Sequence, residues 1–588
     1  MTTALRLPLL PEAEVFSLPM PDQDFAAAFR DPTAGHVQTG SRILALRALT
    51  LLAPLLLTSF VAWVSFGWFA FDGRVTIAET LLILVTGFAF YWVVLSLVTA
   101  ILGLFWRSGA APKPTPDQSL GVAILLPMFG EAALPTLSHA VHLLAKLAQS
   151  PCDHRFSLHV LSDTRDTAQA EQEIAVFHHF QRSNLSLDIT YRRRPMNRDF
   201  KSGNIRDWVR ASGAAHDAML VLDADSVMTS ESVLLMADAL ACDATCGLVQ
   251  SVPRVLPGTT VWQAMQSFAS RVYGANLARG FALWTANEAN FLGHNALIRI
   301  GAFAASAGLP HLSGRAPRGG VILSHDFVEA ALMRRAGWSV KLFPEATGSF
   351  EDTPETLLGY LKRDRRWCQG NMQHLRLLAV PGLHAASRFH LLQGAMAYIA
   401  SVWWLALLVL WALPTQMATG TDIWAVNPLT PVWPNLPAAT QSALAGLVMV
   451  ILVGPKLIGI AAFLRSQGLA RGERLAFVGM VLGEMALSLL MAPTLMVHQV
   501  RAVVGFWAGF DGGWAPHSSG RQPLGLLARF HATETALGAG LLTLAAAGQL
   551  SPWLLPVAVS LILALPLALL AQSPMAPFNR PSLAKELI

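Results

Sequence analysis

The sequence has few charged residues, few cysteines and little net charge, and each shortage excludes a class of protein. Only 13% of its 588 residues are charged, roughly half the share of an average soluble domain, so a soluble enzyme alone does not account for the chain. Its four cysteines show no metal-ligand spacing, which argues against zinc and against a disulfide framework. The net charge of +5 comes from basic residues beside apolar segments, which indicates membrane topology and not nucleic-acid binding.

Apolar residues are abundant and unevenly distributed. They make up 53% of the chain, and the mean hydropathy of +0.46 is typical of a protein with several membrane spans. Most acidic and basic side chains fall within residues 150–380, whereas 43–106 and 390–572 are largely apolar. The sequence therefore predicts a soluble domain inserted between two membrane regions.

The N-terminal part divides into a polar and an apolar segment. Residues 1–40, rich in Pro, Ala and Asp and without periodicity, predict a mobile cytosolic tail. Residues 41–106 predict two transmembrane helices, 43–70 and 76–105, joined by a tight Asp-Gly-Arg turn, because each run exceeds the ~20 residues that cross the hydrocarbon. The apolar run begins too far into the chain for a cleaved signal peptide.

Residues 385–572 predict the second membrane region, followed by a cytosolic tail at 573–588. The loop 414–439 contains no Lys or Arg, whereas 465–474 contains three Arg, so we expect the former to be periplasmic and the latter cytosolic. The apolar runs that predict spans lie at 390–413, 440–464, 533–550 and 552–571.

The remaining apolar stretch, 475–510, is interrupted by Pro493 and allows two interpretations. If the loop after it is also cytosolic, the stretch forms either a short hairpin or one span followed by an interfacial helix. Trp507, Trp514 and Arg501 favour an interfacial element for its second half.

Apolar strands alternate with helix-like segments within residues 115–380. Strands are expected at 122–128, 156–163 and 218–225. This alternation predicts a parallel α/β sheet whose ligand-binding groups follow the carboxyl ends of the strands.

The third strand ends in Asp223-Ala-Asp225. Two carboxylates at this point can hold Mg²⁺ or Mn²⁺ against the charge of a departing nucleoside diphosphate. Acidic pairs after a strand are also common as loop or helix-cap residues, so the motif alone does not decide between the two.

Two further groups surround this pair in the sequence. Asp163 and Asp166 follow the second strand, where a carboxylate can accept hydrogen bonds from a uracil or ribose or can cap a helix. Arg194, Arg198 and Lys201 lie within eight residues, a cation density suited to a diphosphate or to a solvated basic loop.

The end of the predicted domain holds the last candidates. Asp326 precedes an amphipathic helix, where it can deprotonate an acceptor hydroxyl with His325 beside it, or act as the helix N-cap. Arg366 and Trp367 can grip a pyrophosphate and stack on a sugar, or anchor the chain at the membrane interface.

Taken in order, these motifs over residues 120–375 resemble the processive, membrane-embedded family 2 glycosyltransferases such as bacterial cellulose synthase. The departures are Ser324-His325-Asp326 in place of Thr-Glu-Asp, and Arg363 in place of the Gln of Gln-x-x-Arg-Trp. The residues that carry the resemblance are Arg194, Pro195, Asn197, Arg198, Lys201, Gly203, Asn204, Asp223, Asp225, Phe291, Gly293, Arg299, Asp326, Arg366 and Trp367.

The resemblance implies a cytosolic GT-A domain of Rossmann-like fold and roles for individual residues. Asp326 is the implied base of a single displacement that inverts the anomeric carbon, and Asp223 and Asp225 are the implied metal ligands. The implied donor-binding residues are Asp163, Asp166, Arg194, Arg198, Lys201, Asp223 and Arg366. The implied acceptor-binding residues are Trp367, Phe291, Gly293, His294 and Arg363.

The segments SDTRD, SHDFVEA and KRDRRWCQGN are similar, more narrowly, to the glucans biosynthesis glucosyltransferase H family. That similarity implies UDP-glucose as donor, a growing β-1,2-glucan chain passed through a helical channel across the inner membrane, and a separate periplasmic glucan-processing protein. Both termini would be cytosolic.

Other functions stay open because no motif fixes the orientation of the acceptor. A cellulose-like or chitin-like β-1,4 synthase uses the same groups, and transfer to a lipid carrier is a third enzymatic possibility. A polysaccharide export scaffold with a degenerate catalytic domain is the non-enzymatic alternative, which predicts no release of UDP.

Overall fold

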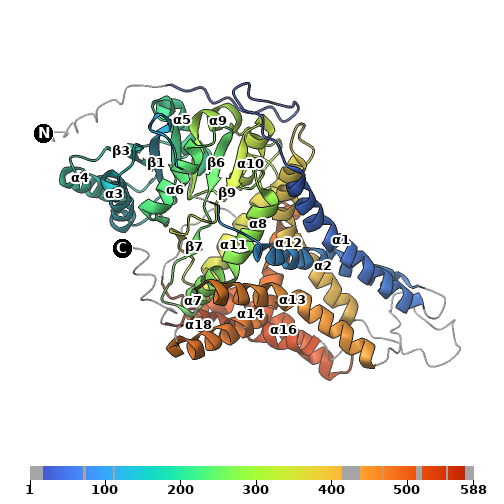
Figure 1. Ribbon diagram of the computed structural model, residues 1–588. Coiled ribbons are helices and arrows are strands. Elements are labelled where there is room, and N and C mark those ends of the chain that lie inside the picture. The colour runs from blue at the N-terminus through green and yellow to red at the C-terminus, as the bar shows by residue number, and fades with distance from the viewer. Residues whose placement is uncertain are drawn as a thin grey trace.

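The computed structural model places an α/β domain against a group of long apolar helices (Figure 1). The structure describes residues 17–575 except 71–74, 110–112, 413–437, 468, 470, 512–519 and 551–553. The chain runs from two long helices into the α/β domain and returns to long helices, so the predicted insertion of a globular domain between two membrane regions is confirmed.

Five helices of the described residues are long and apolar enough to cross a membrane. They are α1 (Ser41–Phe69), α2 (Ile77–Gly103), α12 (Ala385–Ala412), α13 (Ala438–Gln467) and α14 (Arg474–Ala508). Both spans predicted before the α/β domain and the first two predicted after it are confirmed. The Asp-Gly-Arg turn, Trp514, most of the loop 414–439 and most of the tail 573–588 lie outside the described residues.

The stretch 475–510 does not form a hairpin. It is a single helix, α14, of 35 residues that continues through Pro493. Proline removes one backbone hydrogen bond, but membrane helices tolerate it because neighbouring helices and side chains satisfy the freed group. The interpretation as one span with an extension is therefore retained, with the extension continuous with the span.

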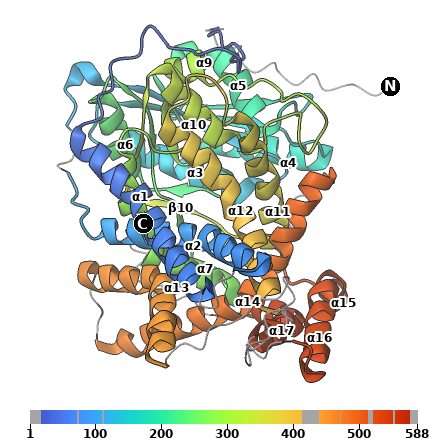
Figure 2. The ribbon, with the colours of Figure 1, turned by 90° about the vertical axis from the view of Figure 1, so that its right-hand side faces the viewer.

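The last two predicted spans are wrong. The run 533–550 forms α16 (Ala532–Ala546), which has 15 residues, and the run 552–571 divides at Leu563 into two helices of eight residues each. All are shorter than the ~20 residues needed to cross the hydrocarbon. Besides α16, this region contains α15 (Leu524–Phe530), α17 (Leu555–Ile562) and α18 (Ala564–Ala571), which lie together at the lower right of Figure 2.

The predicted parallel sheet is a mixed sheet of seven strands in the order β3-β2-β1-β4-β8-β6-β9. Strand β8 runs antiparallel to both of its neighbours, β4 and β6, while the other pairs are parallel. The strands are β1 (Gly121–Met128), β2 (Arg155–Ser162), β3 (Ile189–Arg193), β4 (Ala218–Val221), β6 (Cys246–Gln250), β8 (Ala296–Arg299) and β9 (Ser339–Leu342). The three predicted strands correspond to β1, β2 and β4 and are therefore confirmed.

Helices cover both faces of this sheet. Alternate residues of β1 enter two different cores, Ile124 with α3, α4 and α6, and Leu125 with α5, α9 and α10, because successive side chains of a strand point to opposite faces. The helices are α3 (Ala133–Gln149), α4 (Thr167–Ser183), α5 (Phe200–Ser212), α6 (Ser230–Ala241), α9 (Ile300–Ser306) and α10 (His325–Ala336).

Further elements connect the sheet to the membrane helices. A small second sheet has the order β5-β10-β7, and α11 packs against both α12 and α14. The strands are β5 (Val227–Met228), β7 (Arg254–Val255) and β10 (Ser349–Glu351), and the helices are α7 (Val261–Ala269), a π-helical turn (Ser270–Gly274), α8 (Ala275–Thr285) and α11 (Leu357–Gln373). Short 3-10 turns lie at Pro116–Gln118, Gly213–Ala215, His374–Leu377 and Arg471–Glu473.

One buried carboxylate joins these parts. Glu288 accepts hydrogen bonds from Arg47 of α1 at 2.7 Å and Arg334 of α10 at 2.9 Å, and lies 3.0 Å from His384 before α12. The first membrane helix, the α/β domain and the return to the membrane thus share one ionic junction.

The N-terminal segment differs from the predicted mobile tail. Residues 17–40 lie along the α/β domain, where the side chains of Met20 and Asp31 are buried. Trp338 Nε1 donates to Asp31 Oδ2 at 2.9 Å, and Arg335 Nη2 donates to Gln23 Oε1 at 2.8 Å. The composition gave no sign of this segment, hereafter the N-terminal strap, because its contacts are formed with residues some 300 positions later.

Candidate functional site

The acidic pair after β4 lies in a hydrogen-bonded turn. The Asp223 N–H donates to Ser226 Oγ at 3.0 Å, and that hydroxyl lies 3.2 Å from His294 Nδ1. The other ring nitrogen of His294 lies 3.1 Å from Glu351 Oε2. This chain of contacts fixes the turn between β4 and β5 against the loop that precedes β8.

Lys201 brings the basic loop to the same point. It lies in the first turn of α5, and its ammonium donates to Asp223 Oδ1 and, at 2.7 Å, to the carbonyl of Gly293. Burial would raise the pKa of Asp223, but Lys201 and His294 outweigh it and hold that pKa below its usual value. Asp223 is therefore ionised and already paired with a cation.

Asp225 differs from its neighbour. Burial, together with the charges of Asp223, Glu351 and Asp352, raises its pKa to about 7. Four carboxylates that affect one another, with the pKa of one raised by burial and by the charges of the others, form an environment that a divalent cation would neutralise. The residues present thus fit the predicted metal ion.

Asp326 lies in the first turn of α10 and is not its N-cap, which is Ser324. The capping interpretation of Asp326 is therefore wrong. Burial raises the pKa of Asp326, as suits a general base. The ring of His325 turns aside to Glu329, with His325 Nδ1 3.0 Å from Glu329 Oε2.

Gly293 lies between Lys201 and Asp326. Its φ of +90° is in the left-handed region, and a Cβ added to it would lie 3.3 Å from Asp326 Oδ2. Glycine is needed here because the backbone carbonyl must face Lys201 while the α-carbon lies against Asp326.

Helix α11 closes the site from the membrane side. A Cβ added to Gly370 would lie 2.3 Å from Ser324 Oγ, so α11 lies directly against the start of α10. Arg366 lies near enough to Asp223 for the charge of that carboxylate to raise the pKa of Arg366. Burial has the larger effect and lowers the pKa of Arg366 overall. The Arg363 guanidinium lies 4.5 Å above the ring of Trp367, a half-exposed side chain.

The predicted donor-binding acids are occupied by the protein itself. Both oxygens of Asp163 accept hydrogen bonds from Arg194, at 2.7 and 2.8 Å, and both side chains are buried. Asp166 caps α4 by accepting from the Gln169 N–H at 2.8 Å. Arg198 is exposed. The structure thus gives Asp163, Asp166 and Arg194 structural partners and leaves Arg198 facing solvent.

Phe291 lies away from the site. Its side chain is among the largest fully buried ones and belongs to the core between the sheet and α10. Phe291 and Gly293 precede strand β8, which begins at Ala296 and ends at Arg299. We therefore assign the Phe291 side chain to packing.

Sequence reasoning missed three acids near the pair, Glu131, Glu351 and Asp352. Burial raises the pKa of Glu131, and the charge of Asp223 raises it further. Glu131 follows β1 as Asp223 follows β4, so its place after a strand could have indicated it. Glu351 and Asp352 gave no such signal, because β10 has only three residues.

Relatives extend over most of the chain. A glucans biosynthesis glucosyltransferase H of Vibrio cholerae serotype O1 is 38% identical over 87% of this chain and 73% of its own length. One of Rhodopseudomonas palustris (strain BisA53) is 38% identical over 98% of this chain and 82% of its own length. This chain belongs to the glucans biosynthesis glucosyltransferase H family.

A family model agrees with this membership, and one solved structure shows a distant likeness. A sequence model described as glycosyl transferase family group 2 matches residues 218–418, which include Asp223, Asp326 and Trp367. A solved mannosyltransferase of Pyrobaculum calidifontis, in complex with GDP-Man and Mn2+, covers 73% of this chain and 99% of its own with 14% identity and a TM-score of 0.43. The chain is a glycosyltransferase of glucan biosynthesis with an α/β catalytic domain and membrane helices.

Proposed function

We propose that this protein is an inverting, processive glucosyltransferase that takes glucose from UDP-glucose and builds a β-1,2-linked glucan backbone. The observation that carries the proposal is the convergence of Asp223, Asp326 and Lys201 around Gly293, beside helix α11, which packs against α12 and α14. A single displacement needs a base for the acceptor hydroxyl and positive charge for the leaving group, and Asp326 and the Lys201–Asp223 pair would supply them on either side of one glycine.

In the proposed reaction Asp326 accepts the proton of the acceptor hydroxyl as its oxygen attacks the anomeric carbon. The bond from that carbon to the UDP oxygen breaks, and the electron pair leaves with UDP. Because attack comes from the face opposite the leaving group, an α-linked donor gives a β-linked product. Burial, which raises the pKa of Asp326, makes it a stronger base than an exposed aspartate.

Asp225, together with Asp223, would hold a divalent cation, Mg²⁺ or Mn²⁺. When bound, such an ion neutralises the charge that develops on departing UDP. Lys201 and Arg366 would contribute fixed positive charge to the same diphosphate, and Arg198 would reach it from solvent. The Asp163–Arg194 pair and the Asp166 cap support the loop that carries these groups, so we propose that they act on the donor by positioning.

For the acceptor we propose the surface formed by Trp367, Arg363, Gly293 and His294. The half-exposed indole offers a flat apolar face for a glucose ring, and the guanidinium above it fixes its orientation. Because α11 packs against α12 and α14, a chain held at Trp367 would leave toward these helices.

The proposed arrangement has residues 1–40 and 115–380 in the cytosol, 41–106 as two inner-membrane spans and 385–572 as the helices around the glucan channel, with 573–588 cytosolic. The three Arg of 465–474 support the cytosolic side of that loop. The growing glucan, inner-membrane lipid and a periplasmic glucan-processing protein would be its partners.

Purified protein in nanodiscs, given radiolabelled UDP-glucose and Mg²⁺, tests the proposal by linkage analysis of the product after methylation. We expect β-1,2-linked glucose. A β-1,4 product would replace it with the cellulose-like alternative, and a labelled lipid would indicate a carrier acceptor. Absence of UDP release with both UDP-glucose and UDP-N-acetylglucosamine would favour an export scaffold.

A further inference from the structure

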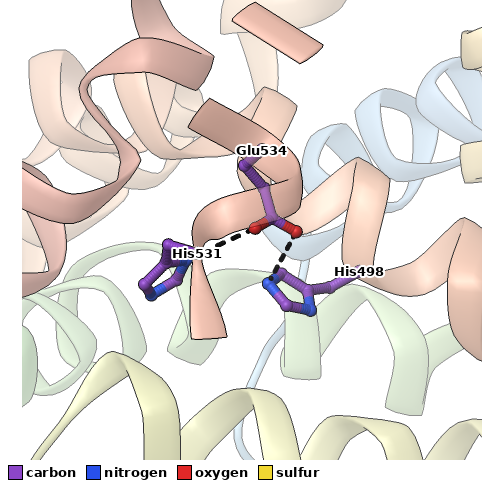
Figure 3. A group of neighbouring side chains, drawn as sticks. All are labelled: His498, His531 and Glu534. Carbon is purple, nitrogen blue, oxygen red and sulfur yellow. Dashed lines mark ion pairs between the residues drawn. The ribbon is translucent and has the colours of Figure 1, made fainter. Parts of the chain in front are cut away.

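Two histidines and a glutamate meet where α14 crosses the junction of α15 and α16 (Figure 3). His498 belongs to α14, His531 joins α15 to α16, and Glu534 lies in the first turn of α16. One ligand atom from each lies within 4.8 Å of the other two. Figure 3 shows the carboxylate of Glu534 between the two rings.

Four buried polar atoms of this cluster lack a hydrogen-bond partner. His531 and Glu534 are fully buried. Among the described residues, neither ring nitrogen of His531 has a hydrogen-bond partner, and the same holds for His498 Nε2 and Glu534 Oε2. Native proteins almost always satisfy such groups, so four unsatisfied atoms around one point indicate a missing ligand.

The neighbours of the cluster hold it in place. The ring of His498 stacks on Phe530 with centroids 4.8 Å apart, and His498 Nε2 lies 3.2 Å from Glu534 Oε1. Arg501 also reaches Oε1, at 3.5 Å, but its side chain is largely exposed. Glu534 Oε2 is left facing His531 Nδ1 at 3.9 Å, a distance that leaves room for an ion between them.

We propose that His498, His531 and Glu534 bind a divalent transition-metal ion, with Zn²⁺ as the best match. Two imidazoles and one carboxylate form a common zinc ligand set, and a water can complete the tetrahedron. This site is separate from the acidic pair at Asp223, whose oxygen ligands suit harder ions. The proposal does not rest on the proposed function.

The ion would join α14 to the α15–α16 junction close to the catalytic domain. Gln499, the residue after His498, donates to Asp364 Oδ2 of α11 at 3.2 Å. Asp364 lies one helical turn from Trp367 on the same helix. The metal would therefore fix the part of α14 that supports α11.

Metal binding can be measured on the full chain, purified in nanodiscs without a histidine tag. After removal of metals by a chelator, Zn²⁺ is titrated against a chromogenic chelator with Mg²⁺ in excess to fill sites for harder ions. We expect one tightly bound Zn²⁺ per chain, and binding at least about tenfold weaker in Glu534→Gln and His531→Ala. His139→Ala, an exposed histidine of α3, and Asp225→Asn should both retain the ion.

Co²⁺ gives a second readout, because its visible absorption reports nitrogen ligands and low coordination number. The bands should appear in the wild-type protein and be lost in Glu534→Gln. That variant preserves shape, so its melting temperature in chelator should equal that of the wild type, and His498→Ala replaces it if it does not. Equal Zn²⁺ affinity in the wild type and the variants, or no tight Zn²⁺ in the wild type, would overturn the proposal.

Discussion

Lys201 is the residue on which the geometry of the site depends. Its ammonium touches the carboxylate of Asp223 and the carbonyl of Gly293, whose α-carbon adjoins Asp326. The groups proposed for leaving-group departure and for proton removal are therefore separated by one glycine. This closeness makes substitutions at single positions informative.

Replacing Asp326 with Asn removes the proposed base without changing its size. We expect kcat for UDP release to fall by about 10²–10⁴-fold, the usual contribution of a positioned general base, while calorimetric binding of UDP changes little. Asp153→Asn, at an exposed position, is the matched control and should have no effect. A near wild-type rate in Asp326→Asn would exclude it as the base.

The pH dependence of kcat/KM provides an independent test. Burial raises the pKa of Asp326 above 3.8, and a base works only when ionised, so activity should fall as pH drops through this raised pKa. Asp225, with a pKa raised to about 7, would contribute a second acid limb. Added divalent cation should shift the acid limb of Asp225 to lower pH and leave the pH of the Asp326 limb unchanged. A single limb at the ordinary aspartate pKa would contradict the assignment.

Gly293→Ala should impair catalysis more than folding. Alanine at φ +90° is strained, and its methyl would press on Asp326 from 3.3 Å. We expect kcat to fall by one to two orders of magnitude, about 1.4–2.7 kcal/mol, in UDP-release assays. Gly301→Ala is the control, since a Cβ there meets nothing within 4 Å. Equal activity in both variants would show that the close approach has no catalytic consequence.

At the scale of helices and strands, hydrophobic runs predicted position better than length. Six spans were predicted outside the stretch 475–510. Four of them correspond to helices long enough to cross a membrane, whereas 533–550 and 552–571 do not. Apolar composition alone does not reveal where a helix stops. The break at Leu563 did have a sequence signal, because Pro566 has no N–H to donate to the carbonyl of Ile562. Pro493 misled in the opposite direction, because α14 passes through it.

An ion pair between two membrane helices offers a test at this scale. Lys456 of α13 donates to Glu484 of α14 at 2.7 Å, and Tyr273 donates to the same carboxylate at 3.0 Å. Lys456→Met leaves this buried carboxylate without its cation and should destabilise the protein by about 3–5 kcal/mol.

The double variant Lys456→Met with Glu484→Leu should recover most of that loss, because no uncompensated charge remains. Thermal unfolding in nanodiscs measures both. A double variant less stable than Lys456→Met would contradict this expectation. It would mean that the polar contacts of the pair stabilise the helices more than the apolar side chains that replace them.

Across the whole molecule, the sequence predicted local features and missed long-range ones. The individual strands and helices of the α/β domain, four spans, the acidic pair and Asp326 each lie within a short segment whose sequence pattern is visible. The antiparallel β8, the Asp163–Arg194 pair, the Glu288 junction and the cluster at His498 depend on segments distant in the chain. No local pattern encodes such contacts.

The N-terminal strap gives the prediction at this scale. Asp31→Ala removes the acceptor of the buried Trp338 indole and should lower stability by about 1–3 kcal/mol. Asp22→Ala, a largely exposed side chain of the same strap, is the control. Differential scanning fluorimetry compares them, and equal melting temperatures for the two variants would indicate that the strap contributes little.

The strap also changes what counts as the catalytic unit. Its residues precede the first membrane helix, yet Met20 and Gln23 fill positions in the surface of a domain that begins some ninety residues later. A fragment limited to the α/β domain by hydropathy, 115–380, would lack the side chains that pack at these positions. The Arg335 and Trp338 donors would then have no acceptors from the strap. The enzyme is thus discontinuous in sequence, and a soluble version would have to carry the strap back through a linker in place of the two spans.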